Sequence, residues 1–188
     1  MIANHSLEHF DDLEAVLREI GRVIQPGGAL FVAVPDASTL SDRVYRWLGR
    51  GGGHVNPFTD ASEVARTIER GTGLRHVATR TLYSSLSFLN RKHAPRPLPR
   101  RVWLVGGGFE PVLRAYVRIS RPADRLLGSR TGVYGWAFYF GEVEAPINTT
   151  PWVNVCIRCG SGFPADSLGT GKAYACPHCG TRNPVVRV

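Results

Sequence analysis

The chain has 188 residues, of which 43% are hydrophobic and 20% are charged. These proportions are typical of a soluble globular protein and exclude a disordered chain. No run of about 18 apolar residues is present, so we expect no membrane-spanning helix. The first residues do not resemble a secretory signal, because no basic segment is followed by an apolar core. We therefore expect a cytoplasmic protein with one ordinary domain and one small additional module.

The formal net charge is +8, and arginine carries most of it because Lys92 and Lys172 are the only lysines. An excess of this size favours anionic partners, although a genome rich in arginine codons gives the same composition. The densest basic cluster lies at residues 91–101. It is consistent with nucleic-acid binding, with a solvated loop and with contact to an anionic membrane, so nucleic acid stays a candidate partner.

The chain first shows the pattern of a helix, a tight turn and a buried strand. Apolar residues recur at helical spacing within 11–24, and Asp11 with Glu14 fits an N-terminal cap. Pro26 and the two glycines after it end this helix. Residues 29–34 are apolar without alternation, as in a parallel strand that is covered on both faces. This half of a β-α-β unit predicts an α/β fold.

The middle of the chain predicts two more helices and another strand. The first is a short helix at 41–48. Val44, Trp47 and Leu48 are expected on one side of this helix. The second is capped by Asp60 with Glu63 and ends at Gly73. Alternation of apolar and polar residues then predicts a strand at 74–84.

Residues 88–132 are predicted to be a basic, proline-punctuated insertion, followed by a final strand at 133–143. The insertion contains an amphipathic helix and a further apolar segment at 123–127. This helix could be a lid over a substrate pocket, could pack on the core or could lie on a membrane. The residues that suggest this amphipathic helix are Val112, Leu113, Tyr116, Val117 and Ile119. Residues 146–151 are expected to form a linker.

The four cysteines of the chain form two C-x-x-C pairs, each followed by a glycine. This pattern resembles a zinc ribbon, here at residues 152–188, and its separation is typical of a tetrahedral zinc site. The predicted ligands are Cys156, Cys159, Cys176 and Cys179. Two disulfides or a redox pair are the alternatives, but the cytosol disfavours disulfides and a redox site needs only one pair. Four thiolates fill the coordination sphere of zinc, so a structural role is predicted.

Several segments together resemble the second half of a class I S-adenosylmethionine-dependent methyltransferase domain. The segments are NHSLEH at 4–9, the helix that ends in RVIQPGG, the strand at 29–34, GHVNPFT at 53–59 and YGWAF at 134–138. The resemblance implies a partial doubly wound, Rossmann-like sheet within residues 1–145. It further implies S-adenosylmethionine as cofactor and methyl transfer to a small-molecule, saccharide or lipid-linked acceptor.

The loop at residues 4–9 would lie at the carboxyl end of a central strand, where open α/β sheets bind ligands. In the resembled fold, Asn4, His5 and Ser6 would contact the cofactor. The sequence H-x-x-E-H in this loop is also a zinc-peptidase signature. A peptidase needs the motif inside a helix, however, and here the motif precedes the predicted helix start.

The resemblance also suggests which residues take part in catalysis. Some methyltransferases bind a divalent metal through a Glu-His pair in this loop and a later histidine, and Glu8, His9 and His54 fall at the matching positions. His5 stands where that pattern has its first acidic ligand. Without a metal, His5 or His9 could act as a general base, because imidazole titrates near neutrality. The alternative is that Glu8 and His9 only cap and pack the loop.

The resembled fold normally begins with a strand, a glycine-rich turn and a helix that hold the cofactor, and Met1 leaves no room for them. We therefore expect that Met1 does not begin a complete catalytic domain. The chain would then be poorly stable alone or would pair with a second polypeptide that supplies the missing half. Whether this chain alone is an enzyme is left open. The alternative function is a non-catalytic module in which the zinc ribbon binds nucleic acid or a partner protein.

Overall fold

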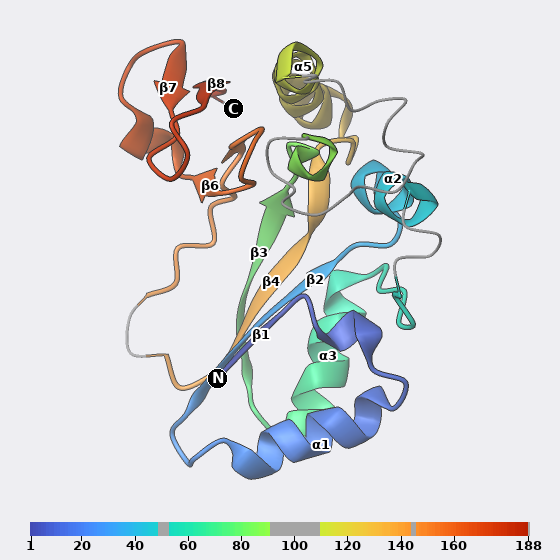
Figure 1. Cartoon of the computed structure of the whole chain (residues 1–188). Helices are drawn as coiled ribbons and strands as arrows, with labels where there is room; N and C mark the ends of the chain where they lie inside the picture. Colours follow the sequence, from blue (N-terminus) through green and yellow to red (C-terminus); the bar gives the residue numbers. More distant parts are fainter. Residues whose placement is uncertain (49–52, 91–109, 144–145, 188) are drawn as a thin grey trace. The chain divides into compact units, whose positions relative to one another are not determined.

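The computed structural model describes residues 1–48, 53–90, 110–143 and 146–187 (Figure 1). The basic cluster at 91–101 lies outside the described residues, as does much of the predicted insertion. Contacts within the chain define two compact units. Unit 1 comprises Met1–Ser38, Gly53–Thr81 and Gly135–Thr150. Unit 2 comprises Thr39–Gly52, Leu82–Tyr134 and Pro151–Val188. The predicted domain boundaries near 145 and 152 stay a prediction, and these two units divide the chain along other lines.

Four strands form one sheet in the order β1-β2-β4-β3 (Figure 1). The strands are β1 (Ile2–Asn4), β2 (Ala29–Pro35), β3 (His76–Tyr83) and β4 (Val133–Gly141). β1 runs parallel to β2, and β4 runs antiparallel to β2 on its other side. Backbone bonds from Gly141 to Arg75 and from Ser84 to Gly132 show that β3 and β4 are antiparallel too. A mixed sheet with a parallel pair at one end confirms the predicted partial doubly wound α/β fold.

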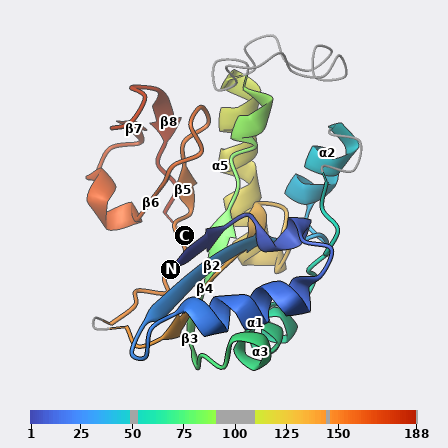
Figure 2. The same ribbon diagram turned by 60° about the horizontal axis from the view of Figure 1, so that its bottom comes forward.

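Two helices, α1 (Leu13–Val23) and α3 (Ala61–Thr72), lie side by side against the sheet (Figure 2). Their apolar sides pack on the inner residues of β2 and β4, which include Val32, Val34 and Phe138. All three of these side chains are fully buried. This cluster is the core of unit 1, and it explains why residues 29–34 are apolar without alternation.

Aspartate side chains cap the N-terminal ends of α1 and α3. α1 begins at Asp12, whose carboxylate accepts a hydrogen bond from the Ala15 amide at 2.9 Å. The predicted cap at Asp11 is therefore wrong by one residue, because Asp12 is the carboxylate that reaches the free amide three positions on. The predicted cap of α3 is confirmed, since Asp60 accepts from the Glu63 amide at 2.8 Å. α3 ends at Gly73, which has a left-handed backbone with φ of 71°.

Two glycines allow α1 and α3 to approach closely. A Cβ at Gly21 of α1 would lie 2.4 Å from the carbonyl oxygen of Thr72 in α3. A Cβ at Gly71 of α3 would lie 2.6 Å from the Cβ of Leu17 in α1. Both distances are shorter than any real contact of this kind, so the spacing of the helices depends on glycine at both positions.

Unit 2 contains α2 (Leu40–Leu48), α5 (Glu110–Leu127) and the cysteine-containing segment. The short elements of that segment are β5 (Asn154–Val155), β6 (Gly162–Phe163), β7 (Ala173–Ala175) and β8 (Arg182–Pro184). The chain also has short 3-10 helices. One lies in unit 1, η1 (Leu7–His9), and two lie in unit 2, η2 (Ser87–Leu89) and η3 (Ala165–Leu168). The core of the unit joins Leu48, Leu86, Leu89, Leu113, Val117, Ile157 and Val186. The cysteine-containing segment therefore shares one core with α2 and α5.

A buried arginine connects three segments of unit 2. Arg121 of α5 is 1% exposed, and its guanidinium lies over the ring of Tyr83 at 4.7 Å. It donates hydrogen bonds to the carbonyl oxygens of Ser84 at 2.6 Å, Val153 at 2.9 Å and Gly132 at 3.3 Å. Burial lowers the pKa of this guanidinium. A charge so deeply buried is tolerated only with such partners, so Arg121 fixes the positions of the segments that it joins.

The apolar residues of the helices in unit 2 are not all buried. Trp47 of α2 is 61% exposed, although Leu48 is buried. In α5, Leu113 and Val117 are buried, but Val112 and Ile119 are 55% and 68% exposed. Successive residues of a helix turn by about 100°, which places Val112 and Ile119 on a different side from Leu113 and Val117. The apolar pattern of α5 therefore covers two sides of one helix.

The described part of the chain also bears on the predicted linker and on membranes. Residues 146–151 have no regular secondary structure, and the backbone of Asn148 accepts a hydrogen bond from Arg80 of β3 at 2.9 Å. Among the described helices, none combines the length with the apolar composition that crossing a bilayer requires.

The close approach of α1 and α3 predicts that Gly21→Ala destabilises the protein. Helix propensity alone would favour alanine by about 1 kcal/mol, but overpacking against a backbone oxygen costs about 1–3 kcal/mol. We expect a net loss of about 1 kcal/mol in the free energy of unfolding, measured by urea denaturation. Arg66→Ala, at an exposed position of α3, is the control and should leave stability unchanged. A stabilised Gly21→Ala variant would contradict the close contact of the two helices.

Candidate functional site

The loop at residues 5–9 follows β1 at the carboxyl end of the parallel strand pair. Asn4 lies opposite Ala33 in the register, and the His5 amide extends this ladder by donating to the Ala33 carbonyl at 2.9 Å. His5 then adopts φ of 51°, a left-handed conformation that is uncommon for a residue other than glycine. Such strain concentrates at functional sites, where the surrounding structure holds it in place. The 5–9 loop is therefore the first candidate site.

The four predicted catalytic residues lie together in this structure. Glu8 is 1% exposed, and its Oε1 lies 3.8 Å from His5 Nδ1 and 3.9 Å from His9 Nε2. The ring of His54 stands edge-on to the ring of His9, with centroids 5.0 Å apart. A buried carboxylate thus faces two imidazoles, and a third imidazole completes the cluster.

Hydrogen bonding fixes the tautomer of His9. Its Nδ1 lies 2.9 Å from the carbonyl oxygen of Gly53. A carbonyl oxygen only accepts, so Nδ1 carries the hydrogen. Nε2, the atom that faces Glu8, is then the basic nitrogen of the neutral ring. This nitrogen can bind a proton or a metal ion.

The segment around Asn56 holds the 5–9 loop from the other side. The Glu8 carbonyl accepts from the amides of Val55 at 2.7 Å and Asn56 at 3.1 Å. The side-chain amide of Asn56 donates to the carbonyls of Leu7 at 3.1 Å and Phe10 at 2.8 Å. Sequence reasoning did not single out Asn56. The available signal was its place in the segment GHVNPFT, beside a loop whose backbone carbonyls need donors.

The charge state of His5 follows from its surroundings. Burial lowers the pKa of its imidazole. The nearby His54 and His9 lower this pKa further, because a positive charge on His5 would be repelled by positive charge on either of them. His5 is therefore neutral at pH 7. A neutral imidazole beside a buried carboxylate can accept a proton.

The cluster also has the composition of a metal site. Glu8, His9 and His54 each offer one ligand atom, and these atoms all lie within 4.8 Å of one another. Carboxylate oxygen and imidazole nitrogen are common ligands of divalent transition metals. The geometry is thus compatible with a metal ion and equally with direct proton transfer by the side chains.

Two predicted cofactor contacts flank this cluster. Asn4 is exposed and Ser6 half-buried at the carboxyl edge of β1. Within the described part of the chain, neither the Asn4 amide group nor the Ser6 hydroxyl makes a side-chain hydrogen bond. Both groups can therefore bind a ligand at this edge, as the predicted cofactor contact requires.

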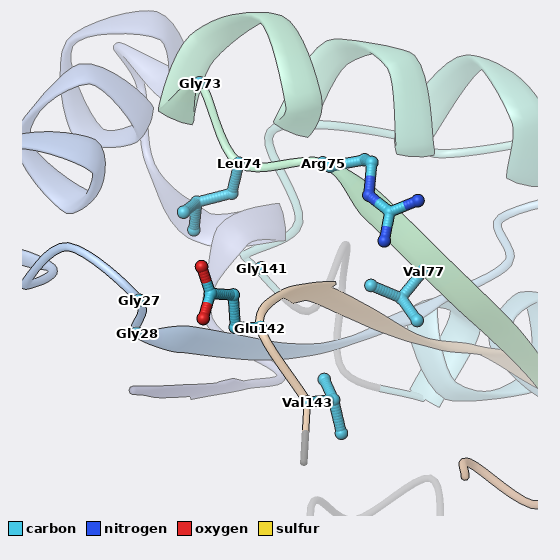
Figure 3. Close-up of a pocket in the computed structure, with 9 residues that line it drawn as sticks. All are labelled: Gly27, Gly28, Gly73, Leu74, Arg75, Val77, Gly141, Glu142 and Val143. Atoms are coloured by element: carbon cyan, nitrogen blue, oxygen red, sulfur yellow. The ribbon is translucent and has the colours of Figure 1, made fainter. Parts of the chain in front are cut away.

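A separate groove of about 590 Å³ lies at the other end of β2 (Figure 3). Its lining combines Gly27 and Gly28 before β2, residues 73–75 with Val77 around the start of β3, and residues 141–143 at the end of β4. Figure 3 shows Arg75 and Glu142 as its charged groups. Both side chains are exposed, and the described lining contains no cluster of titratable groups comparable with His5, Glu8 and His9. It is not the candidate catalytic site.

The four cysteines form the second candidate site. Their sulfurs all lie within 4.8 Å of one another. Sγ of Cys156 is 3.5 Å from Sγ of Cys179, and Sγ of Cys159 is 3.5 Å from Sγ of Cys176. All four are free thiols rather than disulfides. Zn–S bonds of about 2.3 Å place tetrahedral sulfurs about 3.8 Å apart, so the observed spacing fits zinc.

The two halves of this cysteine site repeat the same local structure. In each half the glycine after the second cysteine has a left-handed backbone and donates to the carbonyl of the first cysteine. In each half a hydroxyl follows the glycine and contacts the second sulfur. Ser161 Oγ lies 3.3 Å from Cys159 Sγ, and Thr181 Oγ1 lies 3.4 Å from Cys179 Sγ. A hydroxyl so placed can donate to a metal-bound thiolate.

The pKa values of the thiols differ strongly across the cluster. Burial raises the pKa of Cys156 to about 12. Burial also acts upward on Cys179, but hydrogen bonds with Thr181 and with the neighbouring sulfurs outweigh it and lower that pKa to about 6. Four adjacent thiolates repel one another, and a dication in their centre would remove this cost.

Contacts within unit 2 attach the first cysteine pair, Cys156 and Cys159, to other elements. Ser85 Oγ donates to the Cys156 carbonyl at 2.8 Å, and Asn90 Nδ2 donates to the Ile157 carbonyl at 3.0 Å. Glu110 at the start of α5 accepts from Arg158 at 2.9 Å. The cysteine site is thus held in place by residues outside the ribbon.

The family model described as a methyltransferase domain matches residues 1–78. These residues contain β1, the 5–9 loop, α1, β2 and α3, together with the segment that holds His54 and Asn56. No curated protein matches the chain at a significant level.

Three solved structures are similar to parts of this chain. A SAM-dependent methyltransferase of Archaeoglobus fulgidus is 16% identical, with 74% of this chain and 57% of that chain covered and a TM-score of 0.45. The YcgJ protein of Bacillus subtilis is 15% identical, with 77% and 63% covered and a TM-score of 0.39. Phosphoethanolamine N-methyltransferase 2 of Haemonchus contortus is 11% identical, with 76% and 33% covered and a TM-score of 0.37. The chain thus spans less than two thirds of the length of each.

The environment of His5 makes a prediction about pH. Its pKa in the folded protein lies below the ordinary value of about 6.5, so the unfolded chain binds the proton first. The free energy of unfolding should therefore fall as the pH drops from about 6.5 toward the lowered pKa. A histidine titration followed by NMR should find His5 protonating below its ordinary pKa.

A matched pair of variants tests the cause of this shift. His54→Gln removes one imidazole that lowers the pKa of His5, so it should move that pKa upward. His76→Gln, on β3, should leave it unchanged. A pKa of His5 at or above the ordinary value in the unmodified chain would contradict the described geometry.

Proposed function

We propose, from the premise that residues 1–78 match a methyltransferase domain, that this chain takes part in S-adenosylmethionine-dependent methyl transfer. The predicted resemblance to a methyltransferase domain is confirmed for this part of the chain. The acceptor that we propose is a small molecule, a saccharide or a lipid-linked group. One observation carries the proposal: the 5–9 loop places His5 and His9 around the buried Glu8 at the carboxyl edge of the parallel strands.

The chemistry required of the protein is modest. S-adenosylmethionine supplies an electrophilic methyl group, so the protein must align an acceptor, exclude water and remove a proton. Asn4 and Ser6 are assigned to hold the cofactor, together with the backbone of His5. Their side chains fit this task because both offer polar groups at the edge of the sheet.

Proton removal is assigned to His5. Its Nδ1 faces Glu8, so Nε2 is the atom that takes the proton from an acceptor hydroxyl or amine. The buried carboxylate of Glu8 then stabilises the imidazolium that forms. His9 and His54 complete the cluster, and a divalent cation held by Glu8, His9 and His54 is the alternative use of the same residues.

Binding of the cofactor is the first test. We expect calorimetric titration of S-adenosylmethionine into the purified chain to show binding, with Asn4→Ala and Ser6→Ala each weakening it about fivefold through loss of one hydrogen bond. Ser62→Ala, an exposed serine of α3, is the control and should bind as the unmodified chain does. Absence of binding at millimolar cofactor would remove the proposal for this chain.

The alternative function, a non-catalytic binding module, predicts a different outcome when the same purified chain is titrated. A non-catalytic module would bind no S-adenosylmethionine but would be retained on nucleic acid, with a retention that falls steeply as salt is raised. The net charge of +8 is the observation that favours this alternative.

We propose that the four cysteines hold a structural zinc ion. The two sulfur separations of 3.5 Å, the repeated glycine turns and the hydroxyls of Ser161 and Thr181 support this assignment. Four sulfur ligands leave no open coordination position, so the ion would bind no substrate. Its contribution would be to the folding of unit 2.

Loss of one ligand should therefore have a defined structural result. Cys176→Ser should remove the one zinc ion per chain that metal analysis finds in the unmodified protein. Because Ile157 and Val186 pack in the same core as α5, amide exchange should accelerate in α5 as well as in residues 152–187. Amides of β2 should keep their protection.

Thr170→Ala, at an exposed position of the same segment, is the control and should retain both zinc and protection. Reduced, freshly prepared protein without zinc would refute the assignment.

A further inference from the structure

Helix α5 exposes an apolar stripe in addition to the side that it buries. Val112 is 55% exposed, Ile119 is 68% exposed and Leu126 is 80% exposed. Ala115 is exposed as well, as is Pro122. At 100° per residue these five positions fall within an arc of about 80°, so they form one continuous stripe along the helix. An exposed stripe of this kind on a soluble protein marks a surface of interaction.

The charges around this stripe all have the same sign. Both acidic residues of α5 are occupied elsewhere. Glu110 binds Arg114 at 3.0 Å and Arg158 at 2.9 Å, and its side chain is 14% exposed. Asp124 is 8% exposed and accepts from the amide of Gly132 at 2.7 Å.

Two exposed cations remain beside the stripe. Arg118 and Arg125 lie along one border of it, separated by two turns of the helix, and both are exposed. Neither guanidinium makes a hydrogen bond or an ion pair with the described residues. The outward side of α5 therefore presents apolar side chains and unpaired positive charge, with no acidic residue.

We propose that this side of α5 is a docking surface for an anionic phospholipid bilayer. A helix with an apolar stripe and bordering arginines lies in the plane of the headgroups, with the apolar side chains inserted and the guanidinium groups at the phosphates. The helix of 18 residues would extend for about 27 Å along the membrane surface. None of the residues on this surface is assigned to methyl transfer, so membrane binding would be a second function of the chain.

Other occupants fit the stripe less well. A second copy would bring the same arginines together across the interface, because every exposed charge on this side of α5 is positive. Pro122 also lies in the stripe and interrupts the regular helix that a coiled coil would need. An acidic protein partner would satisfy the charge, but neither of the two described grooves, at the start of β2 and between α1 and α3, is lined by residues of α5. A bilayer requires no groove.

Vesicle sedimentation tests the proposal with the whole chain. We expect the chain to bind extruded vesicles of phosphatidylcholine and phosphatidylglycerol at 3:1 in 50 mM NaCl, and to bind pure phosphatidylcholine vesicles at least about tenfold more weakly. Raising the salt to 500 mM should release it. Ile119→Glu should weaken binding about tenfold or more, because burial of that side chain is lost.

Charge reversal separates the stripe from the overall charge of the protein. Arg118→Glu/Arg125→Glu should weaken binding to the anionic vesicles by about tenfold or more. Arg43→Glu/Arg66→Glu changes the net charge equally at exposed positions outside α5 and should bind as the unmodified chain does. Circular dichroism and thermal unfolding should show all variants to be folded.

Four outcomes would overturn the proposal. The folded chain could fail to bind anionic vesicles at low salt, or the two double variants could lose binding equally. The third outcome is a dimer in light scattering that Ile119→Glu dissociates, which would assign the stripe to a second copy. Equal binding to neutral and anionic vesicles would likewise remove the role of the arginines.

Discussion

The hydrogen-bond ladder on the two sides of β2 is the constraint on which the candidate active site depends. β1 pairs with one edge of β2 in parallel, and the bond from the His5 amide to the Ala33 carbonyl continues that pairing into the 5–9 loop. β4 pairs with the other edge, where a Cβ at Gly135 would lie 2.1 Å from the Val34 carbonyl. β2 is thus paired with a strand on both edges. The pairing with β1 fixes the position at which the 5–9 loop begins. The left-handed backbone of His5 follows from this constraint, because the chain must leave the ladder and return toward α1.

Unit 2 adds buried polar groups to its apolar core. Arg121 binds three backbone carbonyls from separate segments, and Asp124 on the next turn accepts from the amide of Gly132. A buried charge imposes directional requirements that an apolar core does not, so these segments have one favourable arrangement. The cysteine site belongs to the same arrangement, since Ile157 packs beside α5. The cysteine-containing segment and the buried side of α5 therefore share one core.

Where sequence reasoning succeeded, the signal was local. The apolar run of β2, the cap at Asp60 and the cysteine spacing each follow from a few neighbouring residues. Sequence reasoning did not determine which apolar side chains of α2 and α5 are buried. Trp47 and Ile119 carry side chains that usually face inward, and both are exposed. Hydrophobicity indicates that a side chain can be buried, but the partner surface decides whether it is.

The sequence by itself determined the α/β class, most of the helices and strands, the two C-x-x-C turns and the composition of the 5–9 loop. Each of these depends on backbone propensity, periodicity or ligand spacing within a short window. Only the tertiary structure decided that His54 lies against His9, that Asn56 binds the carbonyls of the loop and that Arg121 is buried. These facts depend on contacts between residues far apart in the chain. Such contacts are set by how the strands pair and how the helices pack, and no local pattern encodes them.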